Sequence, residues 1–183
     1  MDIIDKAFLP IVRGKQSPER VKLLNILNKA MSGRIVEKNE TFYMKNASGE
    51  LEFSLLAEGY RKLGLLYRLI QNETLTKGTM LFWDEPEANL NPQLSQTIVQ
   101  ILLELQRMGV QIFIATHDYV LLKEFDLAAT SQDNVLYHTL YKDEDGIVLH
   151  ATTEKMEDLY PNAIDETFAR ILDDEIRRGL DSL

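Results

Sequence analysis

The sequence predicts an α/β fold in which a mainly parallel sheet is flanked by helices and accompanied by a small antiparallel hairpin. The main observation is a strand–helix–strand pattern. The apolar run Leu81–Trp83 is typical of a buried strand, and an amphipathic helix separates it from the segment Val110–Asp118. Parallel strands joined in this way end at the same edge of a sheet, with a right-handed crossover in about 98% of cases. A second observation is the period-two alternation of residues 34–54, and a third is a hairpin pattern in residues 135–151.

The N-terminal third predicts one helix followed by short strands. Ser17-Pro18 is typical of a helix start and Gly33 of a helix end. The apolar stripe of this helix is Val21, Leu24, Leu27 and Met31. The strands that follow are separated by turns at Lys38-Asn39 and at residues 46–49, and their apolar positions are Ile35, Phe42, Met44, Leu51 and Phe53.

Three further helices are expected. One runs from about Ala57 to Gln71, with Tyr60, Leu63, Leu66, Tyr67 and Ile70 on one face. The helix between the parallel strands starts at Asn91 as cap and Pro92 as first residue, and its apolar positions before Gly109 are Leu94, Ile98, Ile101, Leu102, Leu105 and Met108. After a hairpin around residues 143–146, a C-terminal helix carries Ile164, Phe168, Ile171, Leu172 and Ile176 on a face expected to point inward.

The composition favours one compact domain over residues 1–183, with parts at 1–52, 53–126 and 127–183. The longest apolar runs are far shorter than the roughly 20 residues of a membrane span, and the N-terminus lacks the apolar core of a secretory signal. We therefore expect a cytoplasmic protein without membrane partners. The absence of cysteine excludes disulfides and thiolate metal sites.

The net charge of -9 argues against direct binding to nucleic-acid phosphates, because that affinity comes mainly from clustered Lys and Arg. DNA is therefore expected as a partner only through a larger assembly.

Acidic residues at the end of the first parallel strand predict phosphate chemistry. Asp84 could hold Mg²⁺, usually through water, and Glu85 could orient and deprotonate an attacking water. His117 follows the second parallel strand, so the three side chains should converge on one crevice. The alternative is that the acids simply end a strand before Pro86, that Glu87 is solvated, and that His117 is an ordinary hydrogen-bonded histidine.

Gly59 is a third element, because it stands at the start of an amphipathic helix where backbone N–H groups can bind an anion. The alternative is a turn glycine beside a helix start.

In this order, AEGYRKL, LFWDEPEANLNP and IFIATHD resemble the second half of the ABC-type ATPase head, in the group that includes the SMC, RecF and overcoming-lysogenization-defect (OLD) families. The resemblance covers about residues 53–126 and implies a P-loop NTPase-like fold, with ATP and Mg²⁺ as cofactors. TMLFWDE is similar to Walker B, which makes Asp84 the magnesium-associated acid and Glu85 the general base.

The same resemblance implies roles at the dimer interface. Residues Ala57, Glu58 and Gly59, together with Arg61, are similar to the signature motif, which in the family caps the γ-phosphate of a nucleotide on the opposite protomer. ANLNP, with Asn89 and Asn91, is similar to the D-loop that crosses the interface, and His117 is similar to the switch histidine.

The sequence departs from the family pattern at three places. Ala57 replaces a common serine, and Asn91 replaces a common aspartate. The third departure is larger, because no G-x-x-x-x-G-K-[ST] occurs in these residues, and Gly14-Lys15 is followed by Gln16. The resemblance therefore implies the C-terminal part of a nucleotide-binding head that needs a Walker A-bearing lobe or chain. The sheet edge and apolar face that would meet this lobe are expected to be exposed, which favours a homodimer or hetero-oligomer.

Three functions remain open at this point. The first is ATP binding and hydrolysis with the Walker A lobe supplied from elsewhere. The second is a non-enzymatic dimerisation or regulatory module derived from such an ATPase. The third is a metal-dependent phosphoesterase that would use Asp84, Glu85, Glu87, His117 and Asp118. Phage defence, DNA repair and toxin–antitoxin function all occur among relatives, and the residues do not separate them.

Overall fold

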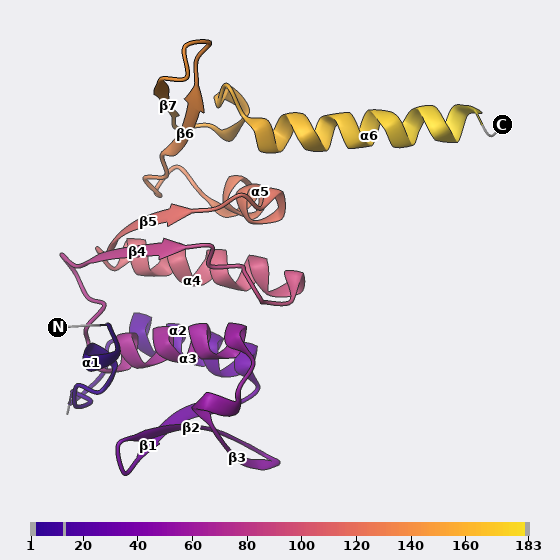
Figure 1. Cartoon of the computed structure of the whole chain (residues 1–183). Helices are drawn as coiled ribbons and strands as arrows, with labels where there is room; N and C mark the ends of the chain where they lie inside the picture. Colours follow the sequence, from indigo (N-terminus) through magenta and orange to yellow (C-terminus); the bar gives the residue numbers. More distant parts are fainter. Residues whose placement is uncertain (1–2, 13, 182–183) are drawn as a thin grey trace. The chain divides into compact units, whose positions relative to one another are not determined.

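The computed structural model describes residues 3–12 and 14–181. The chain divides into two compact units, residues 1–116 and 117–183, which are described separately below (Figure 1). The order of helices and strands agrees with the α/β class predicted from the sequence.

Helices form the core of the first unit. They are α1 (Ile3–Ala7), α2 (Pro18–Met31), α3 (Glu58–Gln71) and α4 (Ser95–Arg107), and α2 packs against both α3 and α4. As predicted, Ser17 caps α2, because its Oγ accepts a hydrogen bond from the Arg20 N–H at 3.2 Å. The helix ends at Met31, two residues before the predicted Gly33, and Ser32 between them is in the left-handed conformation.

The buried apolar side chains of these helices form the core, and they include Leu23, Leu27, Leu63, Leu66, Ile70, Ile98, Ile101, Leu102 and Leu105. The prediction for Val21 and Tyr60 was wrong, since both are exposed.

A three-stranded antiparallel sheet covers one side of α3 (Figure 1). Its strands are β1 (Arg34–Lys38), β2 (Thr41–Asn46) and β3 (Gly49–Glu52), in the order β1-β2-β3. Ile35 pairs with Met44, and both are buried as predicted. Leu51 is exposed, and Phe53 lies in the short helix η1 (Phe53–Leu55) instead of a strand.

The parallel pair is formed by β4 (Met80–Asp84) and β5 (Gln111–Ala115). The turn η2 (Pro92–Leu94) and α4 connect them, which confirms the predicted strand–helix–strand unit. Within the described residues these two strands pair only with each other.

One face of this pair is covered and the other is open. Leu81 is buried on the side of α4, whereas Phe82 is 70% exposed and stacks on the exposed Phe113 with a ring-centroid distance of 4.7 Å. The prediction of a buried strand was therefore wrong for the face that carries Phe82, while the expected exposure of an apolar sheet face is confirmed.

The second unit contains α5 (Tyr119–Ala128), β6 (Tyr137–Lys142), β7 (Val148–Thr153), η3 (Met156–Asp158) and α6 (Ala163–Asp181). Strands β6 and β7 form the predicted antiparallel hairpin. Helix α6 packs on α5, where the rings of Tyr119 and Phe168 stack with centroids 3.8 Å apart.

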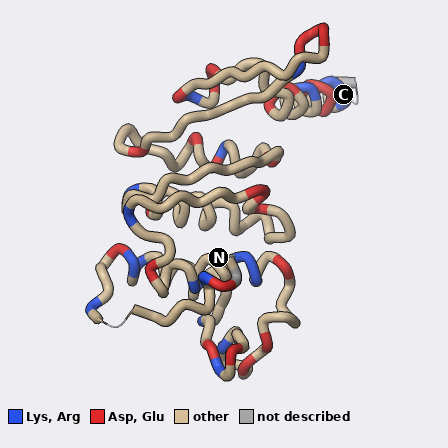
Figure 2. The backbone as a smooth tube through the Cα atoms, turned by 60° about the vertical axis from the view of Figure 1, so that its left-hand side comes forward, with Lys and Arg blue, Asp and Glu red and all other residues tan. Residues whose placement is uncertain are grey.

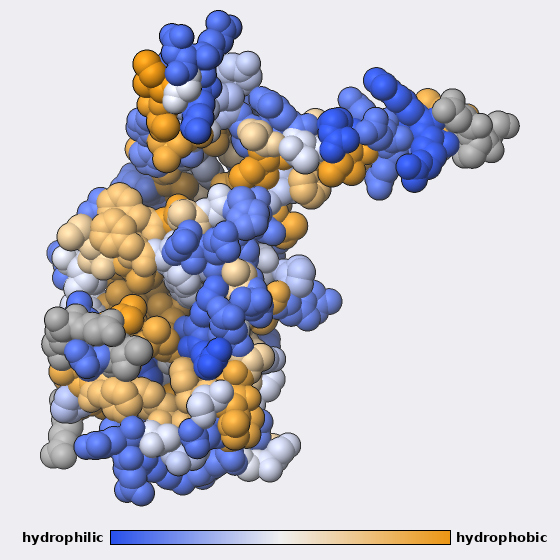
Figure 3. All heavy atoms as spheres, viewed as in Figure 1, coloured by the Kyte–Doolittle hydropathy of each residue, from blue (hydrophilic) through white to orange (hydrophobic). Residues whose placement is uncertain are grey.

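The apolar face of α6 does not point inward as predicted. Leu172, Ile176 and Leu180 are each more than half exposed, because the apolar stripe runs on past the ring contact at Phe168. Hydrophobic residues are visible along this helix in Figure 3, and Figure 2 shows charged residues of both signs on the same helix. None of the helices in the described part of the chain is long and apolar enough to cross a membrane.

Candidate functional site

The acidic turn, residues 84–91, begins where β4 ends and is built by contacts with β5. The register pairs Asp84 with Ala115, and the next N–H, that of Glu85, donates to the Ala115 carbonyl at 2.8 Å. Glu85 then turns left-handed with φ of 45°, and its carbonyl accepts from the Ala88 N–H at 3.1 Å. A non-glycine residue rarely adopts positive φ, so these contacts hold Glu85 in a constrained conformation.

Lys62 of α3 holds the same turn from the other side. Its Nζ donates to the Glu85 carbonyl at 2.9 Å and to the Ala88 carbonyl at 3.2 Å. Hydrogen bonds from a charged donor are stronger than neutral ones, so this half-buried ammonium fixes the backbone that carries the Glu85 carboxylate. Sequence reasoning missed Lys62, because no local pattern connects a helix lysine with a turn 23 residues later.

Gly59 brings α3 against the far end of the acidic turn. A Cβ at Gly59 would lie 2.5 Å from the Asn89 carbonyl oxygen and 2.5 Å from the Leu90 Cδ2. Asn89 is left-handed with φ of 64°, and Asn91 Oδ1 accepts from the Gln93 N–H at 3.0 Å, which confirms Asn91 as a cap. The observed requirement for glycine is thus close packing between the start of α3 and this turn.

The start of α3 has no side-chain cap. Ala57 occupies the cap position without a hydrogen-bonding side chain. The N–H groups of the first helical turn therefore retain the partial positive charge that favours anions.

Glu87 connects the acidic turn to the residue after β5. Its Oε1 accepts from Thr116 Oγ1 at 2.6 Å, while its Oε2 is buried without a hydrogen-bond partner. The interpretation of Glu87 as a solvated residue was therefore wrong. The sequence contained no signal for this contact, because Thr116 reads as an ordinary strand-end residue.

The first unit thus gathers most of the predicted site residues around one turn. Asp84 and Asn89 are exposed in it and Glu85 is half-exposed, while the exposed Ala57, Glu58 and Arg61 stand at the start of the adjoining helix. His117 and Asp118 belong to the second unit, where Asp118 Oδ1 caps α5 through the Leu121 N–H at 2.6 Å. The convergence of His117 with Asp84 stays a prediction.

The residues at the end of β4 fit a Mg²⁺ ion that is also bound to nucleotide phosphates. Mg²⁺ usually takes one or two carboxylates, with phosphate oxygens and waters completing its shell. The exposed carboxylate of Asp84 suits this role, with Glu85 next to it. Within residues 3–12 and 14–181 no group of three or more acidic or histidine side chains could hold a metal ion by itself.

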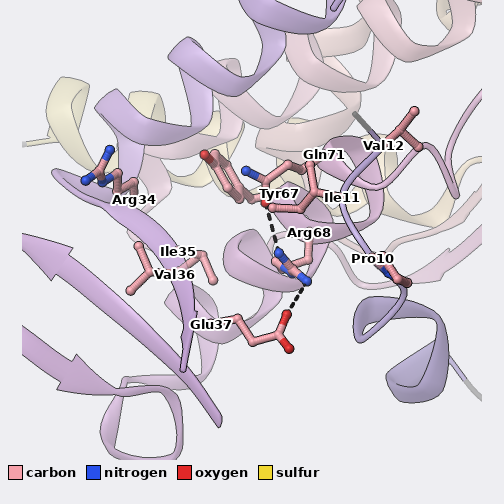
Figure 4. A pocket seen from close by; sticks show the side chains of 10 residues that line it. All are labelled: Pro10, Ile11, Val12, Arg34, Ile35, Val36, Glu37, Tyr67, Arg68 and Gln71. Carbon is pink, nitrogen blue, oxygen red and sulfur yellow. Dashed lines mark hydrogen bonds and ion pairs between the residues drawn. The ribbon is translucent and has the colours of Figure 1, made fainter. Parts of the chain in front are cut away.

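A separate pocket of about 580 Å³ lies between the segment after α1, strand β1 and helix α3 (Figure 4). Its buried guanidinium, Arg68, donates to Glu37 Oε2 at 2.7 Å, to Gln71 Oε1 at 3.1 Å and to the Ala7 carbonyl at 3.2 Å. Burial lowers the pKa of Arg68, and the Glu37 carboxylate opposes this effect. Since these partners engage the guanidinium, the pocket does not present it to a ligand.

A known family model matches most of the first unit and the start of the second. The AAA_21 family model, described as "AAA domain, putative AbiEii toxin, Type IV TA system", matches residues 5–123. The chain belongs to this family. The matched range includes the acidic turn, Lys62, Gly59 and His117.

Two curated proteins share shorter segments with this family member. The Old nuclease of Escherichia phage P2 is 30% identical over 93 residues, which is 50% of this chain and 15% of the nuclease. The energy-coupling factor transporter ATP-binding protein EcfA of Methanothermobacter thermautotrophicus is 37% identical over 49 residues, 27% of this chain and 16% of EcfA. The matches therefore span about a sixth of these relatives.

Solved SMC head structures share the fold. A structure described under ATP-driven dimerization and DNA-stimulated activation of SMC ATPases has a TM-score of 0.51 and 12% identity, covering 87% of this chain and 98% of that one. The Smc head of Pyrococcus furiosus bound to the C-terminal domain of ScpA has a TM-score of 0.54 and 16% identity. The match covers 87% of this chain and 37% of that one. The fold is thus that of an SMC-like ATPase head.

Proposed function

We propose that this AAA_21 chain is the signature and Walker B part of an ABC-type ATPase head and takes part in ATP hydrolysis. The observation that supports this most is the acidic turn, in which Lys62 of α3 and the register of β4 with β5 fix the backbone of Glu85. A carboxylate on a fixed backbone, next to a carboxylate that can bind Mg²⁺, suits phosphoryl transfer to water.

In the proposed mechanism each acidic side chain has one task. Asp84 would hold Mg²⁺, and the ion would neutralise charge on the β- and γ-phosphates. Glu85 orients the attacking water and accepts its proton. Ala57, Glu58, Gly59 and Arg61 would face the γ-phosphate of a nucleotide on a second protomer, with Asn89 and Asn91 at that interface and His117 near the γ-phosphate.

The cradle for the α- and β-phosphates is not part of residues 1–183, since they contain no phosphate-loop sequence. We therefore propose that a Walker A lobe, in cis or as a second chain, completes the site. The open face around Phe82 and Phe113 and the unpaired strand edges of the described sheet are consistent with such a partner. A homodimer or hetero-oligomer in the cytoplasm follows from the same proposal, with DNA as a partner only of the larger assembly.

Nucleotide titration of the chain alone tests the missing cradle. ATP should bind no more tightly than roughly millimolar, about 4 kcal/mol, with negligible turnover. Micromolar binding in a calorimetric titration would show that residues of this chain hold the phosphates.

Substitution of the acids tests the mechanism once the Walker A lobe is present. Glu85→Gln should lower the hydrolysis rate by roughly 10²- to 10⁴-fold and preserve nucleotide binding, because only the base is lost. Asp84→Asn should weaken the magnesium dependence of binding, and His117→Ala should slow turnover. An unchanged rate in Glu85→Gln, with activity abolished by Asp84→Asn, would favour the metal-dependent phosphoesterase instead.

A non-enzymatic dimerisation or regulatory module is the second candidate. Two features favour it. Residues 1–183 contain no phosphate-loop sequence, and Ala57 caps α3 without a hydrogen-bonding side chain. In that case the chain would associate with the Walker A lobe, but the complex would hydrolyse ATP no faster than the same complex with Glu85→Gln.

A further inference from the structure

Two of the three histidines in the chain meet on the hairpin of the second unit. His138 Nδ1 on β6 and His150 Nε2 on β7 lie 2.9 Å apart. The two imidazole rings are nearly parallel, with an interplanar angle of 15° and centroids 5.2 Å apart. Neither histidine has a role in the proposed ATPase mechanism.

The strand register explains why the two rings meet. His138 pairs with Thr152, and His150 pairs with Leu140, so the histidines are diagonal neighbours on the same face of the hairpin. Both side chains are exposed, as are Leu140 and Val148 on the same face. Solvent and dissolved ions can therefore reach the two nitrogens.

The hydrogen bond also defines the chemistry of the pair. At this distance one nitrogen donates and the other accepts, so the accepting nitrogen directs its lone pair at its neighbour. Neutral imidazole nitrogens are good ligands for Zn²⁺, Ni²⁺ and Cu²⁺ but poor ligands for Mg²⁺.

We propose that His138 and His150 form a two-histidine site for a divalent transition metal on the hairpin. Two nitrogens at about 2.0–2.1 Å from a tetrahedral ion are about 3.3 Å apart. The present contact must therefore widen slightly and the rings must turn so that both lone pairs point at the ion, which replaces the shared proton as that proton passes to solvent. Water completes the coordination shell, since no third histidine or carboxylate of the described residues joins the pair. The bound ion would link β6 to β7 across the strand pair.

Calorimetric titration of the full chain with NiCl₂ or ZnCl₂ at neutral pH tests this site. One ion should bind per chain, and an excess of Mg²⁺ should not displace it. His138→Gln and His150→Gln should each weaken binding by at least roughly tenfold, because one of two protein ligands is removed. Thr152→Val, which lies opposite His138 on the hairpin and keeps both imidazoles, is the matched control and should bind with unchanged affinity.

A second measurement uses the unsubstituted protein and so does not depend on the folding of the variants. Paramagnetic Ni²⁺ at substoichiometric amounts should broaden the ring NMR signals of His138 and His150 before those of His117. Unchanged affinity in both hairpin variants, or earlier broadening of the His117 signals, would overturn the proposal. An absence of Ni²⁺ and Zn²⁺ binding by the full chain would do the same.

Discussion

At the scale of single residues, the acidic turn depends on contacts that fix the backbone on both sides of Glu85. The sequence predicted Asp84 and Glu85 at the end of a strand and Asn91 as a cap, because these are local patterns. It did not predict Lys62 or Thr116, because their partners are distant in sequence and are set by the packing of α3 and β5 against the turn. Local chemistry was thus predictable, and tertiary hydrogen bonds were not.

Lys62→Met tests the role of the ammonium in holding the turn. The substitution keeps the aliphatic stem but leaves two carbonyls without their charged donor, so the free energy of unfolding should fall by about 1–3 kcal/mol. Urea unfolding measures this loss. The matched control is Lys45→Met, because Lys45 pairs with Glu50 on the exposed sheet surface, where ion pairs contribute little. Equal stability of the two variants would contradict the proposed role of Lys62.

Gly59→Ala tests the close approach of α3 to the turn. The added methyl group would overlap the backbone at Asn89, so the free energy of unfolding should fall by about 1–3 kcal/mol. Gly179→Ala is the opposite case, because its Cβ would meet nothing within 4 Å in a helix. That variant should be more stable by about 0.5–1 kcal/mol, as alanine is the better helix former. Thermal unfolding of the two variants should therefore shift in opposite directions.

At the scale of elements, the two faces of β4 differ sharply. Adjacent residues alternate between the helix-covered side and the open side, as a strand requires. The sequence alone read β4 as buried, because a run of apolar residues does not reveal whether both faces are covered. The same limitation explains α6, where spacing predicted an apolar stripe correctly but could not indicate what would cover it.

Alanine substitution of two neighbours in β4 distinguishes these faces. Leu81→Ala should lower the free energy of unfolding by about 2–5 kcal/mol, because it leaves a cavity in the core. Phe82→Ala removes an exposed ring and its stacking on Phe113, so it should cost no more than about 1.5 kcal/mol. Phe82→Ala should also reduce the binding of a hydrophobic fluorescent dye. Similar losses of stability in both variants would show that the open face is covered in solution.

At the scale of the whole molecule, the chain consists of two compact units. The single domain expected from the sequence stays a prediction. The fold class followed from the strand–helix–strand pattern, whereas the number of parallel strands did not, because long-range pairing is not encoded in local periodicity.

The stability of the second unit should depend on pH under alkaline conditions, because Tyr137 titrates there. Burial, together with the carboxylate of Asp126, raises the pKa of Tyr137 to about 12, above the unfolded value of about 10. Between these values the unfolded chain loses the phenolic proton and the folded unit keeps it, so stability falls as the pH rises. Tyr137→Phe should remove this part of the pH dependence. Tyrosinate absorbance and urea unfolding as a function of pH measure the two effects, and an unchanged slope in the variant would contradict the assignment.

The buried Arg68 has a consequence for how the first unit opens. Its guanidinium joins the end of α1, strand β1 and helix α3, and it lies 4.9 Å from the centre of the Phe42 ring of β2. Local fraying of any one of these segments would leave a desolvated cation with fewer partners, which is unfavourable. These four segments should therefore exchange their protected amide hydrogens together, as a single cooperative unit of native-state opening.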